Sequence, residues 1–224
     1  MNPIAKTVTL LGIVTALSSL SMACELHLPH ALNHQTNAEH FYQQGLARAK
    51  QGNYEIAIEQ YAKALQINPN YAEAYNNRGN AYFELGNQRE AIAHYNRALE
   101  INPELAEIYY NRGFARYQLG DRKGAIADYD RALEIDPNYL QAYGNRAVVR
   151  SHLGDYQGAI EDYSQVLQFK PELAEVYYNR GFTYSQLGDR QKAIEDLNQA
   201  DRLFSRHGNL RGSLKTHELI GQLQ

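Results

Sequence analysis

The sequence is poor in cysteine, tryptophan and proline. Its 224 residues contain one cysteine, Cys24, and no tryptophan, so no disulfide can form within the chain. The formal net charge of −3 is small and argues against a general binder of nucleic acid or anionic membranes. Only six prolines are present, and several recur at a regular spacing, which is the first indication of the fold.

The sequence also lacks the short motifs of common enzymes. It has no phosphate-binding P-loop, no nucleophile elbow, no HExxH zinc motif and no pairing of cysteine with histidine. Asp128 and Asp130 form an acidic pair, but no glycine follows them at the spacing of a calcium-binding EF-hand. We therefore expect no catalytic activity, no cofactor and no metal site.

Residues 1–23 have the pattern of a secretory signal peptide. Lys6 precedes an apolar run from Val8 to Leu20 of 13 residues, which suits a signal peptide and is short for a bilayer. Small residues then predict cleavage after Ala23. An uncleaved N-terminal anchor is the alternative. Either form predicts an exported protein, in the periplasm or a lumen or attached to the outer side of the inner membrane.

Cys24 would be the first residue after that cleavage. It resembles the lipidated cysteine of bacterial lipoproteins, although Ser21 stands where that family prefers an aliphatic residue. An incidental thiol after an ordinary cleavage site is the other interpretation. Residues 24–37 are predicted to be a linker, because no carboxylate or thiolate pattern completes a metal site with its histidines, which are His27, His30 and His34.

One pattern of residues returns every 34 positions. Asn-Arg dipeptides begin at Asn77, Asn111, Asn145 and Asn179, and prolines recur at Pro69, Pro103, Pro137 and Pro171. Such a period indicates a repeat architecture. It divides the chain into five units, at residues 38–71, 72–105, 106–139, 140–173 and 174–207. In residues 208–224 an apolar face predicts a capping helix that shields the fifth unit, through Leu210, Leu214, Ile220 and Leu223.

Each unit is predicted to hold two helices joined at a glycine. In Leu119-Gly120-Asp121 the glycine ends the first helix and the aspartate opens the second, and proline then ends the second helix. Small residues recur where helices must approach, at Gly79, Gly113, Gly181, Ala91, Ala125, Ala193, Ala64, Ala98, Ala132 and Ala200. Larger gaps are filled by Tyr61, Tyr95, Tyr129 and Tyr163.

The second unit shows the pattern best, as Tyr75-x-x-Arg78-Gly79-x-x-Tyr82 followed by Ala91, Tyr95, Ala98 and Pro103. It resembles the tetratricopeptide repeat, with tyrosine for tryptophan and arginine for leucine. The resemblance covers about three quarters of the chain. It implies an all-α, right-handed superhelical solenoid of five helix-turn-helix repeats plus the capping helix. The Asn-Arg-Gly and Leu-Gly-Asp motifs are similar to those of exported bacterial members of the family, especially cyanobacterial ones.

Arginine recurs at the 34-residue spacing, and in three of the repeats an aspartate follows it at a fixed distance. Sixteen residues after Arg112, Arg146 and Arg180 stand Asp128, Asp162 and Asp196, whereas unit one lacks both members. Antiparallel helices joined at the glycine turn bring these positions to one level. We therefore predict interhelix pairs 112/128, 146/162 and 180/196, in preference to a basic ladder for phosphate. In unit two, His94 takes the place of the aspartate beside Arg78.

The resemblance also implies a binding surface, because the first helix of each repeat lines a concave groove in this family. The matching asparagines are Asn77, Asn111, Asn145 and Asn179, whose amides can pair with an extended peptide. The aromatic residues beside them are Phe83, Tyr110, Phe114, Tyr117, Tyr178 and Phe182. Acidic residues line one rim, at Glu73, Glu107 and Glu175.

These features predict a non-enzymatic scaffold or adaptor that binds a protein or extended peptide in the groove, as in complex assembly. Lys50 is the only basic residue expected there, so the carboxylate clamp of chaperone-tail receptors is not expected. An uncharged or mildly basic guest fits better. A self-associating structural protein is the alternative, although a monomer is favoured over a homo-oligomer. No nucleic-acid partner is expected, and membrane contact only through the N-terminal lipid or anchor.

Overall fold

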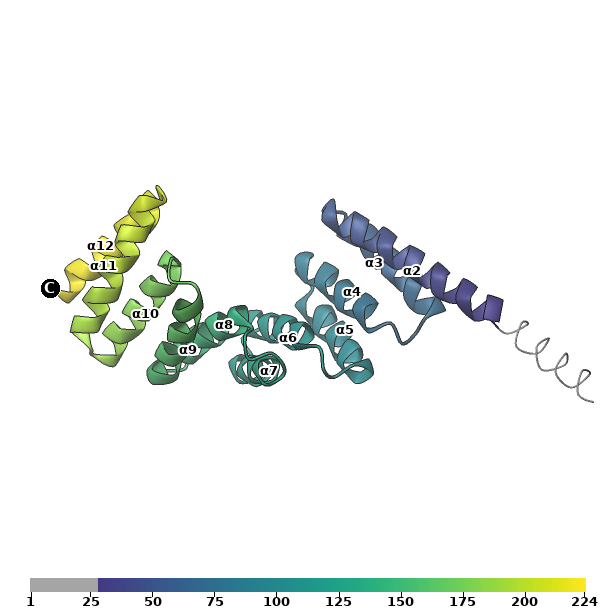
Figure 1. Cartoon of the computed structure of the whole chain (residues 1–224), viewed down its shortest axis with the longest axis horizontal. Helices are drawn as coiled ribbons and strands as arrows, with labels where there is room; N and C mark the ends of the chain where they lie inside the picture. The colour runs from purple at the N-terminus through teal and green to yellow at the C-terminus, as the bar shows by residue number, and fades with distance from the viewer. Residues whose placement is uncertain (1–27) are drawn as a thin grey trace, which may run out of the picture.

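A computed structural model describes residues 28–224, and all regular structure within them is helical. The predicted signal peptide and Cys24 lie outside the described residues. Within residues 28–224 no helix is both long enough and apolar enough to cross a membrane. The helices, which follow one another in pairs along an arc (Figure 1), are α2 (Leu28–Lys50), α3 (Tyr54–Ile67), α4 (Ala72–Glu84), α5 (Gln88–Ile101), α6 (Ala106–Gln118), α7 (Arg122–Ile135), α8 (Leu140–His152), α9 (Tyr156–Phe169), α10 (Ala174–Leu187), α11 (Arg190–Arg206) and α12 (Leu210–Leu223).

Helix α2 corrects the prediction of a linker at residues 24–37, because the chain is helical from Leu28 onward. Pro29 lies in the first turn of α2, where a missing backbone N–H costs no helical hydrogen bond. No glycine interrupts the residues between Pro29 and His40. The segment therefore has no helix-breaking residue after its first turn.

The turns between paired helices follow the glycine pattern that the sequence predicts. Gly52, Gly86, Gly120, Gly154 and Gly188 have φ values between 77° and 90°, a conformation that residues with a Cβ rarely adopt. In the later units an aspartate then caps the second helix. The carboxylates of Asp121 and Asp155 accept the N–H groups of Gly124 and Gly158, and that of Asp189 accepts the N–H of Lys192.

The curvature comes from unequal contact between the two kinds of helix. We call α2, α4, α6, α8 and α10 the first helices, and α3, α5, α7, α9 and α11 the second helices. Each first helix touches the first helix of the next unit, whereas within the described residues successive second helices do not touch. The first helices therefore form the shorter, inner side of the arc. Helix α12 contacts both α10 and α11 and continues the inner row.

Small residues and tyrosines build the core, as the sequence predicts. The alanines at positions 57, 91, 125, 159 and 193 are fully buried, as are those at 64, 98, 132 and 200. Tyr61, Tyr95 and Tyr129 lie against Gly45, Gly79 and Gly113 of their partner helices. An added Cβ at Gly45 would lie 2.4 Å from the Tyr61 ring, so these glycines are required for close packing of the two helices.

The predicted arginine–aspartate pairs are confirmed. The guanidinium of Arg112 donates Nε and Nη2 to Asp128 at 3.0 and 2.6 Å, and that of Arg146 donates the same two groups to Asp162 at 2.9 and 2.6 Å. The Arg180 guanidinium holds Asp196 at 2.6 and 2.8 Å. In each case the remaining nitrogen, Nη1, bonds to the preceding unit, through Asn96, Asp130 and Ser164. The pairs therefore join successive repeats as well as the two helices of one repeat.

Unit two is the exception in this network. Its arginine, Arg78, faces His94, and the buried Nε of Arg78 has no hydrogen-bond partner among the described residues. Burial, and secondarily the Arg78 charge, lowers the pKa of His94 from 6.5 to about 4. The imidazole stacks instead on Tyr82, with ring centroids 5.1 Å apart.

Replacing His94 with aspartate is expected to stabilise the protein at pH 7 by about 1 kcal/mol, because it supplies the missing partner of Arg78. In the wild type, the folded-state pKa of about 4 lies below the unfolded value of 6.5. The unfolded chain therefore binds more protons between these values, and stability falls as pH decreases from 6.5 toward 4. Thermal midpoints measured across this range should fall less steeply in His94→Asp. Parallel curves for the two proteins would contradict the assignment.

Helix α12 caps the solenoid with a different face from the one predicted. Leu210 and Leu214 are 75% and 61% exposed, whereas Ser213 and Thr216 are buried. The small Gly212 lies against the ring of Phe204 on α11, and the Ser213 hydroxyl bonds to Asp201. The predicted inward face was therefore wrong for Leu210 and Leu214, because small residues allow the close approach of α12 to α11 that a leucine would block, whereas Ile220 and Leu223 are partly buried.

Candidate peptide-binding groove

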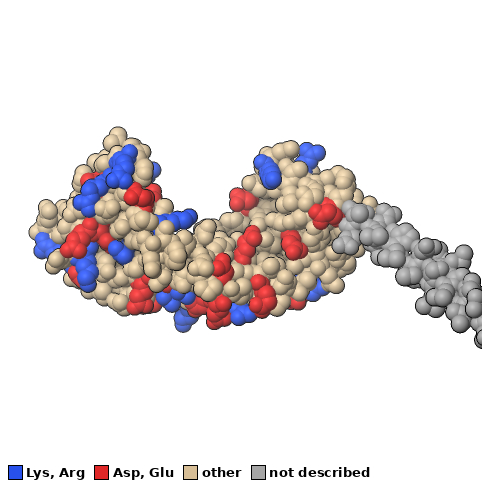
Figure 2. Space-filling view, in the orientation of Figure 1, with Lys and Arg blue, Asp and Glu red and all other residues tan. Residues whose placement is uncertain are grey.

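The first helices form the inner wall of the arc, and Figure 2 shows the molecule hollowed between its two raised ends. Four of the pockets in residues 37–224 lie along this row of helices. In chain order they are a pocket around Glu73 and Glu107 (about 280 Å³), one around Phe83 and Phe114 (about 330 Å³), one at Gly144 (about 240 Å³), and one under α12 (about 420 Å³). They lie next to most of the predicted binding residues.

The four repeated asparagines, which we call the asparagine ladder, already make hydrogen bonds within the protein at three of their positions. The amide of Asn77 donates to the hydroxyl of Tyr42 at 2.9 Å, and Asn145 donates to that of Tyr110 at 3.1 Å. The amide of Asn111 donates to the side-chain oxygen Oδ1 of Asn76 at 3.2 Å. Each bond reaches the preceding first helix. These amides therefore help to set the spacing of the repeats, and they keep only part of their bonding capacity for a guest.

Asn179 differs because its neighbour in the preceding unit is a glycine. The residues at this position in successive units are Tyr42, Asn76, Tyr110, Gly144 and Tyr178. Gly144 offers no acceptor, and a Cβ built on it would meet nothing within 4 Å. The side-chain amide of Asn179 has no hydrogen-bond partner within residues 37–224. It is the member of the ladder with its full bonding capacity available.

The pocket around Phe83 and Phe114 brings four of the predicted binding residues together. Phe83, Tyr110, Asn111 and Phe114 line it, with Asn80 and Glu84, which sequence reasoning did not single out. The rings of Phe83 and Phe114 lie 5.3 Å apart at an angle of 40°. Burial raises the pKa of Tyr110, so this residue stays neutral. The pocket can therefore take an apolar side chain, with a polar backbone group held beside it by an amide.

Three predicted residues lie outside these pockets. The Tyr117 hydroxyl contacts the Nδ1 atom of His152 at 3.1 Å, and the two rings stack. Phe182 is 40% exposed, and Asn77 is bonded to Tyr42. In the repeat pattern these three residues look the same as their equivalents that line pockets, so the sequence could not show that they lie outside.

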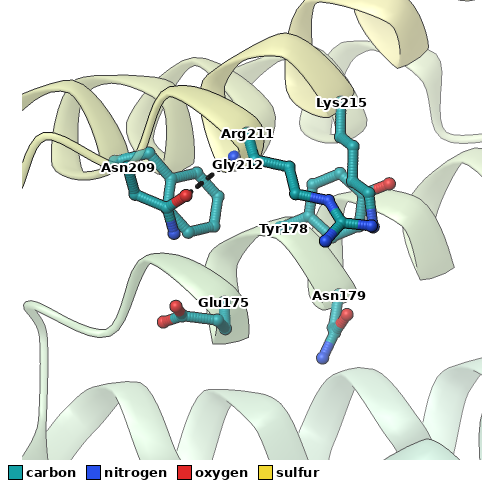
Figure 3. Close-up of a pocket in the computed structure, with 8 residues that line it drawn as sticks. Glu175, Tyr178, Asn179, Asn209, Arg211, Gly212 and Lys215 are labelled. Atoms are coloured by element: carbon teal, nitrogen blue, oxygen red, sulfur yellow. Dashed lines mark hydrogen bonds between the residues drawn. The ribbon is translucent and has the colours of Figure 1, made fainter.

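The pocket under α12 corrects the prediction that Lys50 is the only basic residue of the groove. Glu175, Tyr178 and Asn179 line it from α10, and Arg211 and Lys215 line it from α12. Figure 3 shows both cationic side chains reaching from α12 over Tyr178 and Asn179. They were missed because α11 has 17 residues where the earlier second helices have 14, which displaces α12 from the 34-residue period.

The opposite end of the groove is acidic. Glu39, Glu73 and Glu107 recur 34 residues apart on the first three first helices and are exposed. Burial, followed by the charges of Glu73 and Glu39, raises the pKa of Tyr42. The Tyr71 hydroxyl donates to the Glu39 carboxylate. This arrangement places tyrosine rings beside carboxylates that form no ion pair within residues 37–224.

Comparison with known sequences agrees with the repeat pattern. The profile described as "TPR repeat" matches residues 45–86, 79–120 and 152–188. Profiles described as "Tetratricopeptide repeat" match residues 106–139, 128–161 and 174–207. These profiles indicate no enzyme family. No curated protein matches the chain.

Solved structures share the fold. A crystal structure of MamA is 25% identical, covers 77% of this chain and 94% of its own, and gives a TM-score of 0.71. YrrB, described as a TPR protein with an unusual peptide-binding site, is 24% identical with 86% and 98% coverage and a TM-score of 0.72.

A third structure has a bound ligand. The first TPR of Spaghetti (RPAP3), bound to an HSP90 peptide, is 31% identical, covers 54% of this chain and 95% of its own, and gives a TM-score of 0.53. Together with the profile matches over most of residues 45–207, these likenesses support a protein-interaction scaffold. The chain belongs to the tetratricopeptide-repeat family.

Proposed function

We propose that this protein is a non-enzymatic adaptor that binds an extended peptide segment of a partner protein in its concave groove. The observation that carries the proposal is the row of pockets along the first helices, where amides and aromatic rings alternate. An extended peptide presents N–H and C=O groups at short intervals, and side-chain amides can pair with both. The aromatic pockets supply the apolar contact area that such weak polar bonds need.

The peptide bound to the Spaghetti structure and the peptide-binding site of YrrB support this proposal for the present chain. Assembly of a larger protein complex is the role in which such binding would act. Helix-lined walls of this kind are largely pre-formed, so binding requires little ordering of the protein.

The test uses peptides selected by display against the full chain, then synthesised with a fluorescent label. We expect Phe114→Ala with Asn179→Ala to weaken their binding about tenfold or more, because the pair removes one aromatic anchor and the free amide. Fluorescence anisotropy measures the affinity. The matched control is Arg131→Ala with Glu134→Ala, an exposed ion pair on a second helix, which should bind like the wild type. Equal affinities for all three proteins would refute groove binding.

Self-association is the second candidate, and it is favoured by one observation. Leu210 and Leu214 present an exposed apolar strip on the last helix, which another copy of the chain could cover. Light scattering of the full chain should then show a dimer that increases with concentration and is lost in Leu210→Ser with Leu214→Ser. A monomer at all concentrations would rule out self-association and leave the adaptor function as the remaining proposal.

We also propose that the protein is exported, on the basis of residues 1–24. Intact mass after expression in a bacterial host would distinguish cleavage after Ala23, lipidation of Cys24 and an uncleaved anchor.

A further inference from the structure

Charge is distributed unevenly along the groove, and this follows from two columns of residues on the inner row of helices. The second residues of α4, α6, α8, α10 and α12 are Glu73, Glu107, Gln141, Glu175 and Arg211. The sixth residues of the same helices are Asn77, Asn111, Asn145, Asn179 and Lys215. Counted from the start of each helix, the final helix thus carries cations at two positions where the earlier helices carry acids and amides.

The pocket linings show the same polarity. The two pockets nearer the N-terminal end contain Glu73, Glu84, Glu104 and Glu107 and no lysine or arginine. The two nearer the C-terminal end contain Lys170, Arg211 and Lys215, with Glu175 as their one acid. One half of the groove is therefore electronegative, and the other carries a net positive charge.

The cations under α12 are available for a ligand. Within residues 37–224, neither Arg211 nor Lys215 makes an ion pair or a side-chain hydrogen bond, and both are exposed. They are four residues apart, so they project from successive turns on one side of α12. Figure 3 shows them above Asn179, whose amide also lacks a partner in this part of the chain. Three sets of donors therefore line one pocket, and none of them bonds to Glu175, the carboxylate that also lines it.

The acidic half differs in chemistry as well as in sign. Paired tyrosine rings flank the glutamates, with Tyr42 and Tyr71 centroids 4.8 Å apart and those of Tyr110 and Tyr139 5.0 Å apart. Burial, and after it the charge of Glu107, raises the pKa of Tyr139. Aromatic faces beside carboxylates attract ammonium and guanidinium groups.

We propose that the groove selects a dipolar segment of its partner, with basic side chains over Glu39, Glu73 and Glu107 and an acidic side chain in the pocket of Asn179, Arg211 and Lys215. The proposal rests on the proposed groove-binding function and adds the charge pattern of the guest. Because the charges lie at opposite ends, they fix the position of the segment along the groove. Electrostatic complementarity of this kind selects one register among several that the amides would accept.

The experiment uses the full chain and labelled synthetic peptides with blocked termini. The probe has two lysines at one end, two aspartates at the other and leucine, serine and asparagine between them. All-basic and all-acidic versions serve as comparisons. We expect the dipolar peptide to bind most tightly, and Arg211→Glu with Lys215→Glu to weaken it about tenfold. The reversed protein should then prefer the peptide with lysines at both ends, and circular dichroism checks that it is folded.

The outcomes separate this inference from the proposed function. Equal binding of the three peptides, or no effect of the charge reversal, overturns the dipolar guest while display-selected peptides still report groove binding. A peptide with serines for aspartates and a free C-terminal carboxylate is a further arm. If it binds as tightly as the dipolar probe, the pocket takes a chain end and the proposed acidic side chain is wrong. If no selected peptide responds to the groove variants, both proposals fail.

Discussion

Asp162→Asn is expected to destabilise the protein by about 3–5 kcal/mol, the cost of leaving buried charges without their partner. Asp162 is only 2% exposed and accepts from Arg146 at 2.6 and 2.9 Å and from Arg150 at 3.0 Å. An amide has the same shape but no charge, so two guanidinium groups would lose the carboxylate that neutralises them. Urea unfolding followed by circular dichroism measures the change.

The matched control is Glu104→Gln, which makes the same chemical change at an exposed residue. Glu104 meets Arg131 at 3.2 Å, with the two side chains 69% and 40% exposed, and such a pair contributes about 0–1 kcal/mol. A shift in midpoint for Asp162→Asn no larger than that of Glu104→Gln would show that the buried network contributes little. The effect should also reach the neighbouring unit, because Arg146 bonds to Asp130 at 2.6 Å.

Tyr129→Ala is expected to cost about 3–5 kcal/mol, since it empties the space between α6 and α7. The ring is fully buried and lies against Gly113 on one side and Tyr110 on another, with tyrosine centroids 6.0 Å apart. Glycine at position 113 cannot fill the cavity. Because Tyr129 belongs to the middle unit, its loss also weakens the interfaces on which both neighbouring units depend.

Two variants make this prediction specific. Tyr129→Leu should cost less, because Leu197 already fills the equivalent space against Gly181 in the fifth unit. Phe169→Ala removes a ring of similar size that is 57% exposed, and it should change the unfolding midpoint little. If Tyr129→Ala and Phe169→Ala unfolded at the same urea concentration, the tyrosine column would not be the core of the solenoid.

Part of the groove could be predicted from the 34-residue period alone. The period places Asn111, Phe114 and Tyr110 on one helix face, and the structure brings them to one pocket. The period could not predict that the hydroxyls of Tyr42 and Tyr110 accept hydrogen bonds from the asparagine amide of the following unit. Those bonds join residues 35 positions apart, and their existence depends on the angle between successive helices. Asn179 is free only because Gly144 interrupts that series.

The sequence by itself determined the family, the helix pairs, their glycine turns and the arginine–aspartate pairs, because each of these depends on spacing within one repeat. Only the tertiary structure decided which face of α12 packs and which of its residues reach the groove. Helix α11 is longer than the other second helices, and α12 begins at Leu210, two residues after the position that the 34-residue period from Ala174 predicts. Arg211 and Lys215 are therefore the second and sixth residues of α12, where the period predicts Asn209 and Ser213. Packing at the end of a solenoid has no following unit to repeat it, and the period therefore carries no information about it.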